Sequence, residues 1–187
     1  MPPKVRITKE EIVSTALALL REQGEGAINA RSIAAALGCS TQPVFSNFAT
    51  MEELRAAVTA AAYEHYLGFL DREAERGEYP TYKAFGMAYV GFATEERELF
   101  KLLFMRDRTG ENLSVTPDFQ SSVELIMEAN GISYEKAFLM HMEIWAVVHG
   151  IGVMIATSFL PLDSATVSEM LSDVYQGLRA RYLVKEN

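Results

Sequence analysis

The sequence predicts an all-α protein of about nine helices, and three observations support this prediction. Apolar residues recur at spacings of three and four along most of the chain, which is the period of an amphipathic helix. Capping patterns and glycine or proline breaks separate these segments from one another. No convincing run shows the alternation of apolar and polar residues that a half-buried strand requires. The 187 residues are enough for a small domain and a larger one.

Three short helices are expected near the N-terminus. Thr8 begins a capping-box pattern that opens the first helix, and Gly24 ends it. Asn29 is a candidate cap for a second helix that stops at Gly38, and Ser40 is a candidate cap for a third helix. Together these helices make up a predicted helix-turn-helix domain over residues 1–50.

Six further helices are expected in a larger domain over residues 51–187. Thr50 begins a second capping box, Pro80 suits the first turn of a helix, and Gly131 and Pro161 mark breaks. The expected ranges are 51–76, 81–94, 96–105, 118–129, 133–158 and 164–183.

Charge is distributed unevenly between these two parts. The chain carries a net charge of −8. Residues 1–50 contain five Lys and Arg against four Asp and Glu, a balance of +1, whereas residues 51–187 contain twelve against twenty-one, a balance of −9. An acidic body repels DNA, so a DNA-binding function requires the larger domain to point away from the duplex. Cys39 is the one cysteine, which excludes an intrachain disulfide and a cysteine-based zinc site.

Residues 33–45 have the mechanics of a helix-turn-helix. Ala34 allows the helices to approach closely, and Gly38 stands at the turn, where a positive φ is easily adopted only by glycine. Short hydrogen-bonding side chains then begin the third helix, where they can meet base edges and phosphates. Val44, Phe45 and Phe48 are expected to face the core. A helical hairpin that only packs against the core is the alternative.

Four patterns follow one another over residues 8–60. They are Ile12…Ala16…Leu19-Leu20…Gly24, Ile33-Ala34…Leu37-Gly38-Cys39-Ser40, Val44-Phe45-x-x-Phe48 and Glu52-Glu53-Leu54. Their order and spacing resemble the DNA-binding domain of the tetracycline-repressor (TetR) family of bacterial regulators. Residues 92–105 and Trp145…His149-Gly150 resemble the sensor domain of a TetR subgroup named for its Trp-His-Gly residues. The resemblance implies a dimer in which a ligand shifts the helix over 51–76 and thereby the recognition helices.

The predicted DNA-binding surface combines the outward polar residues with nearby cations. It contains Lys4, Arg6, Lys9, Arg31, Ser40, Thr41, Gln42, Pro43, Phe45, Ser46, Asn47 and Met51. The family often has Tyr in place of Phe45 and Lys in place of Met51, positions that usually contact phosphate. This chain therefore lacks one hydroxyl and one cation there, and the neighbouring Lys and Arg residues are expected to compensate.

A ligand pocket is expected among the aromatic and sulfur-bearing side chains of the larger domain, although an ordinary core would have the same composition. The candidate pocket residues are Tyr66, Phe69, Tyr89, Phe92, Phe104, Met105, His141, Trp145 and His149. A metal site is not expected, because His141 and His149 would lie about 12 Å apart along one helix.

The helix over 133–158 is apolar enough to raise the possibility of a membrane span. Interruption by His149 and glycines, and the lack of a flanking basic cluster, favour a buried helix instead. Small residues here and an apolar stripe on the last helix are expected to form a dimer interface, with an intrachain core as the alternative. The candidate interface residues are Gly150, Gly152, Ala156, Val167, Leu171, Val174 and Leu178.

The sequence therefore predicts a cytoplasmic bacterial repressor that a small apolar or amphipathic molecule releases from double-stranded operator DNA. No signal sequence, membrane partner, metal or cofactor is expected, and the effector is unknown. Dinucleotide, Walker, G-x-S-x-G, H-E-x-x-H and di-iron patterns are missing, so an enzyme is not expected. The alternatives are a helical-bundle ligand-binding protein or enzyme without DNA binding, and an adaptor that binds only protein.

Overall fold

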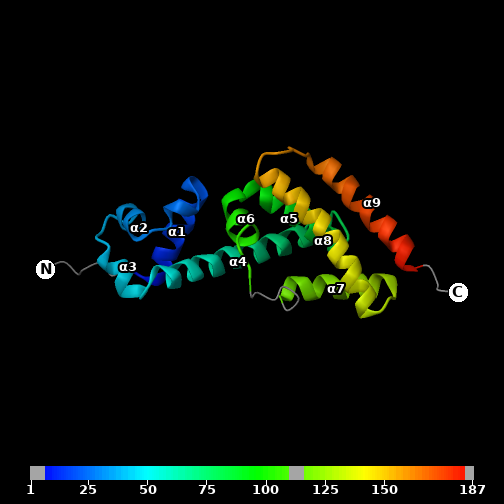
Figure 1. Ribbon diagram of the computed structural model, residues 1–187, viewed down its shortest axis with the longest axis horizontal. Helices are drawn as coiled ribbons and strands as arrows, with labels where there is room; N and C mark the ends of the chain where they lie inside the picture. The colour runs from blue at the N-terminus through cyan, green and yellow to red at the C-terminus, as the bar shows by residue number, and fades with distance from the viewer. Residues whose placement is uncertain (1–6, 110–115, 184–187) are drawn as a thin grey trace. The chain divides into compact units, whose positions relative to one another are not determined.

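The computed structural model describes residues 7–109 and 116–183, and within these residues the protein is all-α (Figure 1). A 3-10 turn at Glu25–Ala27 accompanies nine α-helices in this part of the chain. The helices are α1 Lys9–Gln23, α2 Ala30–Ala36, α3 Gln42–Asn47, α4 Met51–Glu75, α5 Thr81–Glu95, α6 Arg97–Phe104, α7 Pro117–Asn130, α8 Tyr134–Ala156 and α9 Ser164–Leu183. The all-α prediction is confirmed, and Lys4 and Arg6 lie outside the described residues.

Local capping explains where several helices begin and end. The Thr8 hydroxyl accepts the Glu11 N–H at 3.1 Å, and the Glu11 carboxylate accepts the Thr8 N–H at 2.8 Å, which completes the expected capping box. Asn29 caps α2 by accepting the Ser32 N–H at 2.9 Å. Gly131 ends α7 with a φ of 62°, a conformation that costs glycine little.

The chain forms two compact units, and the boundary differs from the expected one after residue 50. Unit 1 contains residues 1–66 and 96–106, and unit 2 contains residues 67–95 and 107–187. The first part of α4 and all of α6 therefore belong with the three N-terminal helices. The reason is a tertiary contact, because α6 packs against α1.

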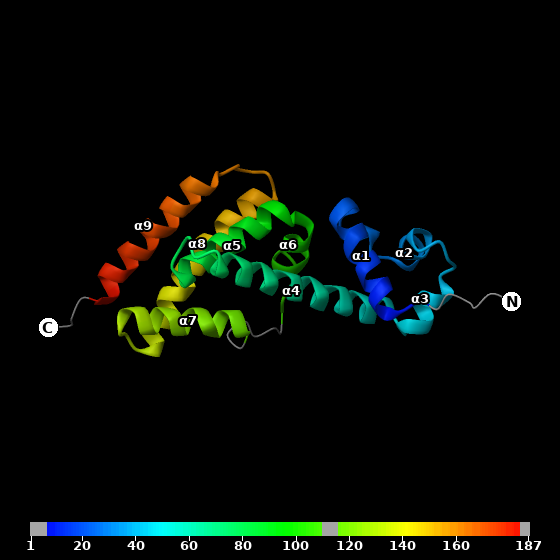
Figure 2. The ribbon, with the colours of Figure 1, turned by 180° about the vertical axis from the view of Figure 1, so that it is seen from behind.

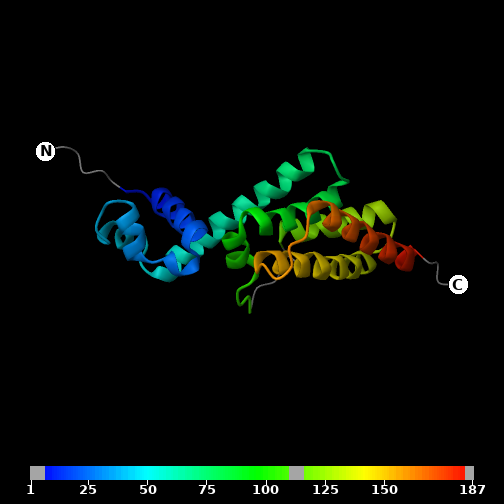
Figure 3. The same cartoon turned by 90° about the horizontal axis from the view of Figure 1, so that it is seen from above.

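Helix α8 is the centre of unit 2, where it contacts α5, α7 and α9 (Figures 2 and 3). Nine of its residues are buried. Among the described helices, α8 alone is long and apolar enough to cross a membrane, but this test is also passed by the core helix of a folded domain. Its three neighbouring helices fit the core position that its apolar sequence predicts.

Close packing inside unit 2 overturns part of the expected dimer interface. A Cβ atom added to Gly86 of α5 would lie 3.1 Å from Leu171 of α9, so these two helices are in intimate contact. Leu171 and Val167 are buried in this contact region of α9, and Gly152 and Ala156 are buried on α8. These four residues are core positions of their own chain, and their assignment to a surface between two chains is wrong. Gly150, Val174 and Leu178 remain partly exposed.

Candidate functional site

The turn between α2 and α3 is closed by two backbone hydrogen bonds. Gly38 has a φ of 64° and donates its N–H to Ala35 at 3.1 Å, while Cys39 donates to Ala34 at 2.9 Å. This pair of bonds is a Schellman motif, which satisfies the last carbonyls of a helix and reverses the chain direction sharply. The motif confirms the role expected for Gly38 and sets α3 at an angle to α2.

Helix α3 begins one residue later than its expected cap allows. Thr41 is the N-cap residue of this helix, and no side chain accepts a capping hydrogen bond. The expectation that Ser40 caps the helix is therefore wrong. Pro43 gives a physical reason, because it stands three residues after Ser40, where a cap would accept an N–H, and proline has none.

Phe45 points outward on α3, which corrects its expected place in the core. Val44 is 1% exposed and Phe48 is 3% exposed, whereas Phe45 is 52% exposed. The helical repeat puts adjacent residues about 100° apart, so a short helix that buries Val44 cannot also bury Phe45 completely. Gln42, Phe45 and Ser46 are exposed together, at the spacing of one helix face.

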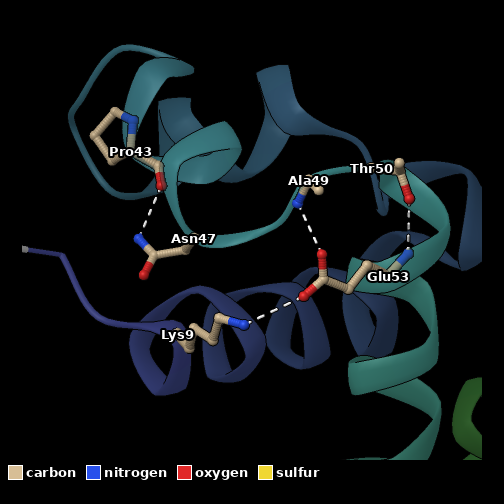
Figure 4. Close-up of polar contacts among 6 residues, drawn as sticks. All are labelled: Lys9, Pro43, Asn47, Ala49, Thr50 and Glu53. Atoms are coloured by element: carbon tan, nitrogen blue, oxygen red, sulfur yellow. Dashed lines mark hydrogen bonds and ion pairs between the residues drawn. The ribbon is translucent and has the colours of Figure 1, made fainter.

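Asn47 stabilises the fold instead of contributing a free side chain (Figure 4). Its amide nitrogen donates to the Pro43 carbonyl at 2.8 Å and to the Ile7 carbonyl at 3.2 Å. These bonds hold the end of α3 and the residue before α1, so the expected outward orientation of Asn47 is wrong. The Ser46 hydroxyl also donates within the helix, to the Gln42 carbonyl at 2.8 Å, although Ser46 itself is exposed.

Lys9 is engaged by its own chain. Its ammonium group lies 3.2 Å from the Glu53 carboxylate (Figure 4). The same ammonium group lies 5.0 Å from the centre of the Phe48 ring. The other Glu53 oxygen accepts the Ala49 N–H at 2.8 Å, and the Thr50 hydroxyl accepts the Glu53 N–H at 3.1 Å. The second capping box thus forms with the Ala49 N–H in place of the Thr50 N–H. These contacts fasten α1 to the start of α4.

The remaining predicted surface residues have varied environments. Arg31 and Ser40 are exposed, whereas Thr41, Pro43 and Met51 are half-buried. Arg31 lies in the first turn of α2. Among the described residues, it forms no ion pair with an acidic side chain. Among the cations of unit 1 that the structure describes, Arg31 is therefore available for a phosphate group.

Two tyrosine–histidine pairs join α5 to α8 in unit 2. The Tyr89 hydroxyl lies 2.8 Å from Nδ1 of His149, and the Tyr82 hydroxyl lies 3.0 Å from Nδ1 of His141. Trp145 stacks on the His149 ring, with centroids 5.0 Å apart and planes 12° apart. Tyr82 was not among the expected pocket residues. Its signal in the sequence is that Tyr82 and Tyr89, like the two histidines, lie about two helical turns apart.

The polar groups of these pairs are held in their neutral forms. Burial lowers the pKa of His141 to about 4. Burial and the nearby Arg108 also lower the pKa of His149. Burial raises the pKa of the Tyr82 and Tyr89 hydroxyls well above the usual range. All four groups are uncharged near pH 7, and Arg108 and Asp118 are the nearby charged groups that act on them.

The predicted pocket residues do not all lie in one unit. Phe69 and Phe92 meet edge to face at 5.6 Å in unit 2, whereas Tyr66 and Phe104 meet at 5.1 Å in unit 1. Met105, also in unit 1, is exposed.

A groove of about 470 Å³ lies in unit 1 between α1 and α4, and none of the predicted pocket residues lines it. Its lining residues are Lys9, Glu10, Val13, Ser14, Leu17, Phe48, Glu53, Ala57 and Ala61. In the part of the chain that the structure describes, no group of three or more His, Cys, Asp and Glu residues could hold a metal ion.

Comparison with known proteins finds one curated relative and several solved structures of similar fold. No family model matches the chain. An uncharacterised helix-turn-helix transcriptional regulator of Mycobacterium tuberculosis is 21% identical over 182 residues, which cover 94% of this chain and 84% of that protein.

Solved structures show the same arrangement of helices. A protein of unknown function from Rhodococcus sp. RHA1 has a TM-score of 0.75 and 22% identity, covering 96% of this chain and all of that one. A TetR-like regulator from the same organism has a TM-score of 0.61 and 16% identity over the whole of both chains. The Streptomyces coelicolor TetR family protein ActR, in complex with (S)-DNPA, has a TM-score of 0.57 and 17% identity, covering 95% of this chain and all of that one. This chain therefore has the fold of the TetR-like transcriptional regulators.

Proposed function

We propose that this protein is a ligand-responsive, DNA-binding transcriptional regulator that acts as a repressor. The observation that carries the proposal is the α2–α3 pair, in which a Schellman turn is followed by a short helix that exposes Gln42, Phe45 and Ser46 on the surface of unit 1. A helix presented in this way can enter the major groove of DNA. The similarity to helix-turn-helix and TetR-like regulators supports the same function.

The sensor site is proposed to lie in unit 2, around Tyr89, Trp145 and His149. Stacked rings and a hydrogen-bonded Tyr–His pair provide apolar surface with a few polar groups, which is the usual composition of a small-molecule site. Because the ring-bearing groups are themselves neutral near pH 7, an apolar or amphipathic effector fits them. The complexes of ActR with (S)-DNPA and of the multidrug binding protein EbrR with imidazole support a small-molecule effector.

The protein is proposed to act as a homodimer through the outer face of α8. Leu139 and Met142 are exposed large apolar residues, and Ala146, Gly150 and Val153 continue this stripe at spacings of three and four. A Cβ atom at Gly150 would meet no atom within 4 Å among the described residues beyond its own helix backbone. A partner helix could therefore approach closely there, and burying this stripe would remove an apolar surface from water.

A gel-shift experiment tests the DNA-binding part of this proposal. The full-length protein is titrated into duplexes that cover the intergenic region beside its own gene, at low and at physiological salt, with unrelated duplex as competitor. A retarded band that survives competitor at physiological salt is the expected result. If the protein binds none of these duplexes selectively, the DNA-binding part of the proposal is contradicted. A ligand-binding bundle or a protein adaptor, each without a DNA target, would then be favoured.

A thermal-shift experiment tests the sensor site. Apolar and amphipathic compounds are screened for those that raise the melting temperature, and the active compound is then tested with Trp145→Ala and Tyr134→Ala. Tyr134 is an exposed aromatic residue of the same helix, so Tyr134→Ala should respond as the wild type does. Trp145→Ala should lose the stabilisation by the ligand. An unchanged response in Trp145→Ala would place the effector elsewhere.

A further inference from the structure

We propose that α3 reads A·T base pairs, with Gln42 recognising adenine and Phe45 contacting the methyl group of thymine. This inference rests on the proposed DNA-binding function and specifies the kind of operator that the protein recognises. It follows from which side chains α3 exposes, which side chains its own fold already occupies, and which charges are missing near it.

The exposed face of α3 contains one carboxamide and one aromatic ring. Gln42 and Phe45 are three residues apart and are both exposed, so they share a face of the helix. Phe45 is about half exposed, and the apolar residues that α3 and the residue after it bury are Val44 and Phe48. A half-exposed phenylalanine on a helix that would enter a groove can bury its ring against thymine methyl groups, which are the apolar features of the major groove.

Intrachain hydrogen bonds leave Gln42 as the carboxamide that can read a base. The Asn47 amide nitrogen is held by the Pro43 and Ile7 carbonyls, so Asn47 cannot present a free donor and acceptor together. Among the described residues, the Gln42 side chain has no such partner, although its backbone carbonyl accepts the Ser46 hydroxyl. Adenine offers the matching acceptor and donor at N7 and N6, and a glutamine can bond to both.

Missing cations disfavour a guanine-reading α3. Guanine is most often recognised by Arg or Lys through O6 and N7. Residues 32–54 contain no Lys, Arg or His, and Lys9 is held by Glu53 and Phe48. Arg31 belongs to α2, so any guanine contact that it makes is separate from the α3 positions. The bases read by α3 should therefore be A·T pairs.

The test begins with selection of binding sites from a library of random duplexes by the full-length wild-type protein. The recovered half-sites should contain A·T pairs at the positions that change when α3 is altered. At the position that Gln42 reads, the wild type should prefer A·T over G·C by roughly 5- to 150-fold, the range expected for one bidentate contact. Gln42→Arg should reverse this preference, so that G·C is selected there. Gln120→Arg adds the same charge at an exposed position on α7 and should leave the selected site unchanged.

Replacing thymine by uracil isolates the Phe45 contact, because uracil lacks only the methyl group. Substituting a single thymine in the selected half-site should weaken wild-type binding by about 4-fold, the value of one buried methyl group. Phe45→Ala should bind the thymine and uracil duplexes equally. Uracil at a position outside the half-sites is the control for both proteins, and circular dichroism melts confirm that both variants are folded.

The outcomes separate this inference from the proposed function. The A·T assignment would be overturned if the protein binds specifically but prefers G·C at the base pairs whose preference changes when α3 is altered, and if Arg31→Ala keeps that G·C preference. The regulator function would then remain intact. Equal losses for uracil in wild type and Phe45→Ala would overturn the role of Phe45. Selection that enriches no sequence at all would contradict the DNA-binding function and, with it, this inference.

Discussion

Arg21 of α1 and Glu96, the residue between α5 and α6, form a two-point ion pair. Nε and Nη2 of Arg21 lie 2.8 Å and 3.0 Å from the Glu96 carboxylate, across 75 residues of chain. The same carboxylate lies 2.9 Å from Nε2 of His65 on α4. Glu96 is the residue before α6 and the first residue of unit 1 after the chain leaves α5. It therefore joins three helices of the proposed DNA-binding unit at the point where α5 ends.

Removing this carboxylate should weaken unit 1. Glu96→Gln is expected to lower the free energy of unfolding by about 1 kcal/mol, because a bidentate pair is lost but Arg21 is partly exposed. Glu98→Gln is the matched control, since the ion pair that Glu98 makes among the described residues is with Lys101 of the same helix. Denaturant melts compare the two variants, and equal effects would show that the link between helices contributes nothing special.

Stability should fall in acid because of His141. Its folded pKa of about 4 lies below the ordinary value of 6.5, so the neutral form stabilises the fold. This stabilisation is complete above pH 6.5 and is lost as the pH falls toward 4, up to about 3 kcal/mol. His141→Asn should be less stable at pH 7 but should show a flatter decline between these values. Urea unfolding at a series of pH values measures the free energy of unfolding of both proteins. If that free energy falls equally steeply as the pH is lowered in the wild type and in His141→Asn, this assignment is contradicted.

Asn47 and Gln42 should differ in what their replacement affects. Asn47→Ala removes two hydrogen bonds that hold α3 to its surroundings and should cost about 1–3 kcal/mol of stability. Gln42→Ala changes an exposed side chain and should leave the melting temperature within about 2 °C of the wild type. Thermal melts of the two variants are the measurement. A stable Asn47→Ala variant would contradict the structural role of this amide.

A single charge on the outer face of α8 should separate the proposed dimer. Ala146→Glu places a carboxylate in the apolar stripe, whereas Ala129→Glu makes the same change at an exposed position on α7. Sedimentation velocity should give a dimer for the wild type and Ala129→Glu and a monomer for Ala146→Glu at micromolar concentration. A dimer in all three proteins would move the interface away from this stripe.

The helices could be predicted from the sequence because their boundaries depend on local chemistry. Thr8, Asn29 and Gly131 each interact with backbone groups a few residues away, and such contacts follow directly from spacing. The Gly38 turn is local in the same sense. Ser40 was the exception, because the missing N–H of Pro43 removed the group that a cap would have bound.

Tertiary contacts could not be predicted in this way. Nothing near Leu171 in the sequence indicates that it packs against Gly86, so its assignment to a dimer surface was wrong. The ion pair between Arg21 and Glu96 is equally invisible to local patterns. The orientation of Phe45 depends on which of two neighbouring apolar residues the core of unit 1 accommodates. Val44 is buried there, so Phe45 is exposed.

In the proposed function, the exposed face of α3 selects a DNA sequence. Fluorescence anisotropy at physiological salt should measure binding of the wild type and of Gln42→Ala/Phe45→Ala to the duplex selected by the wild type and to a scrambled duplex. The wild type should prefer its selected duplex by about 1,000-fold or more. The double variant should lose most of that preference, keep its weak binding to the scrambled duplex and melt as the wild type does. A folded double variant with wild-type affinity and selectivity would contradict the account, because α3 would then not be the element that reads DNA.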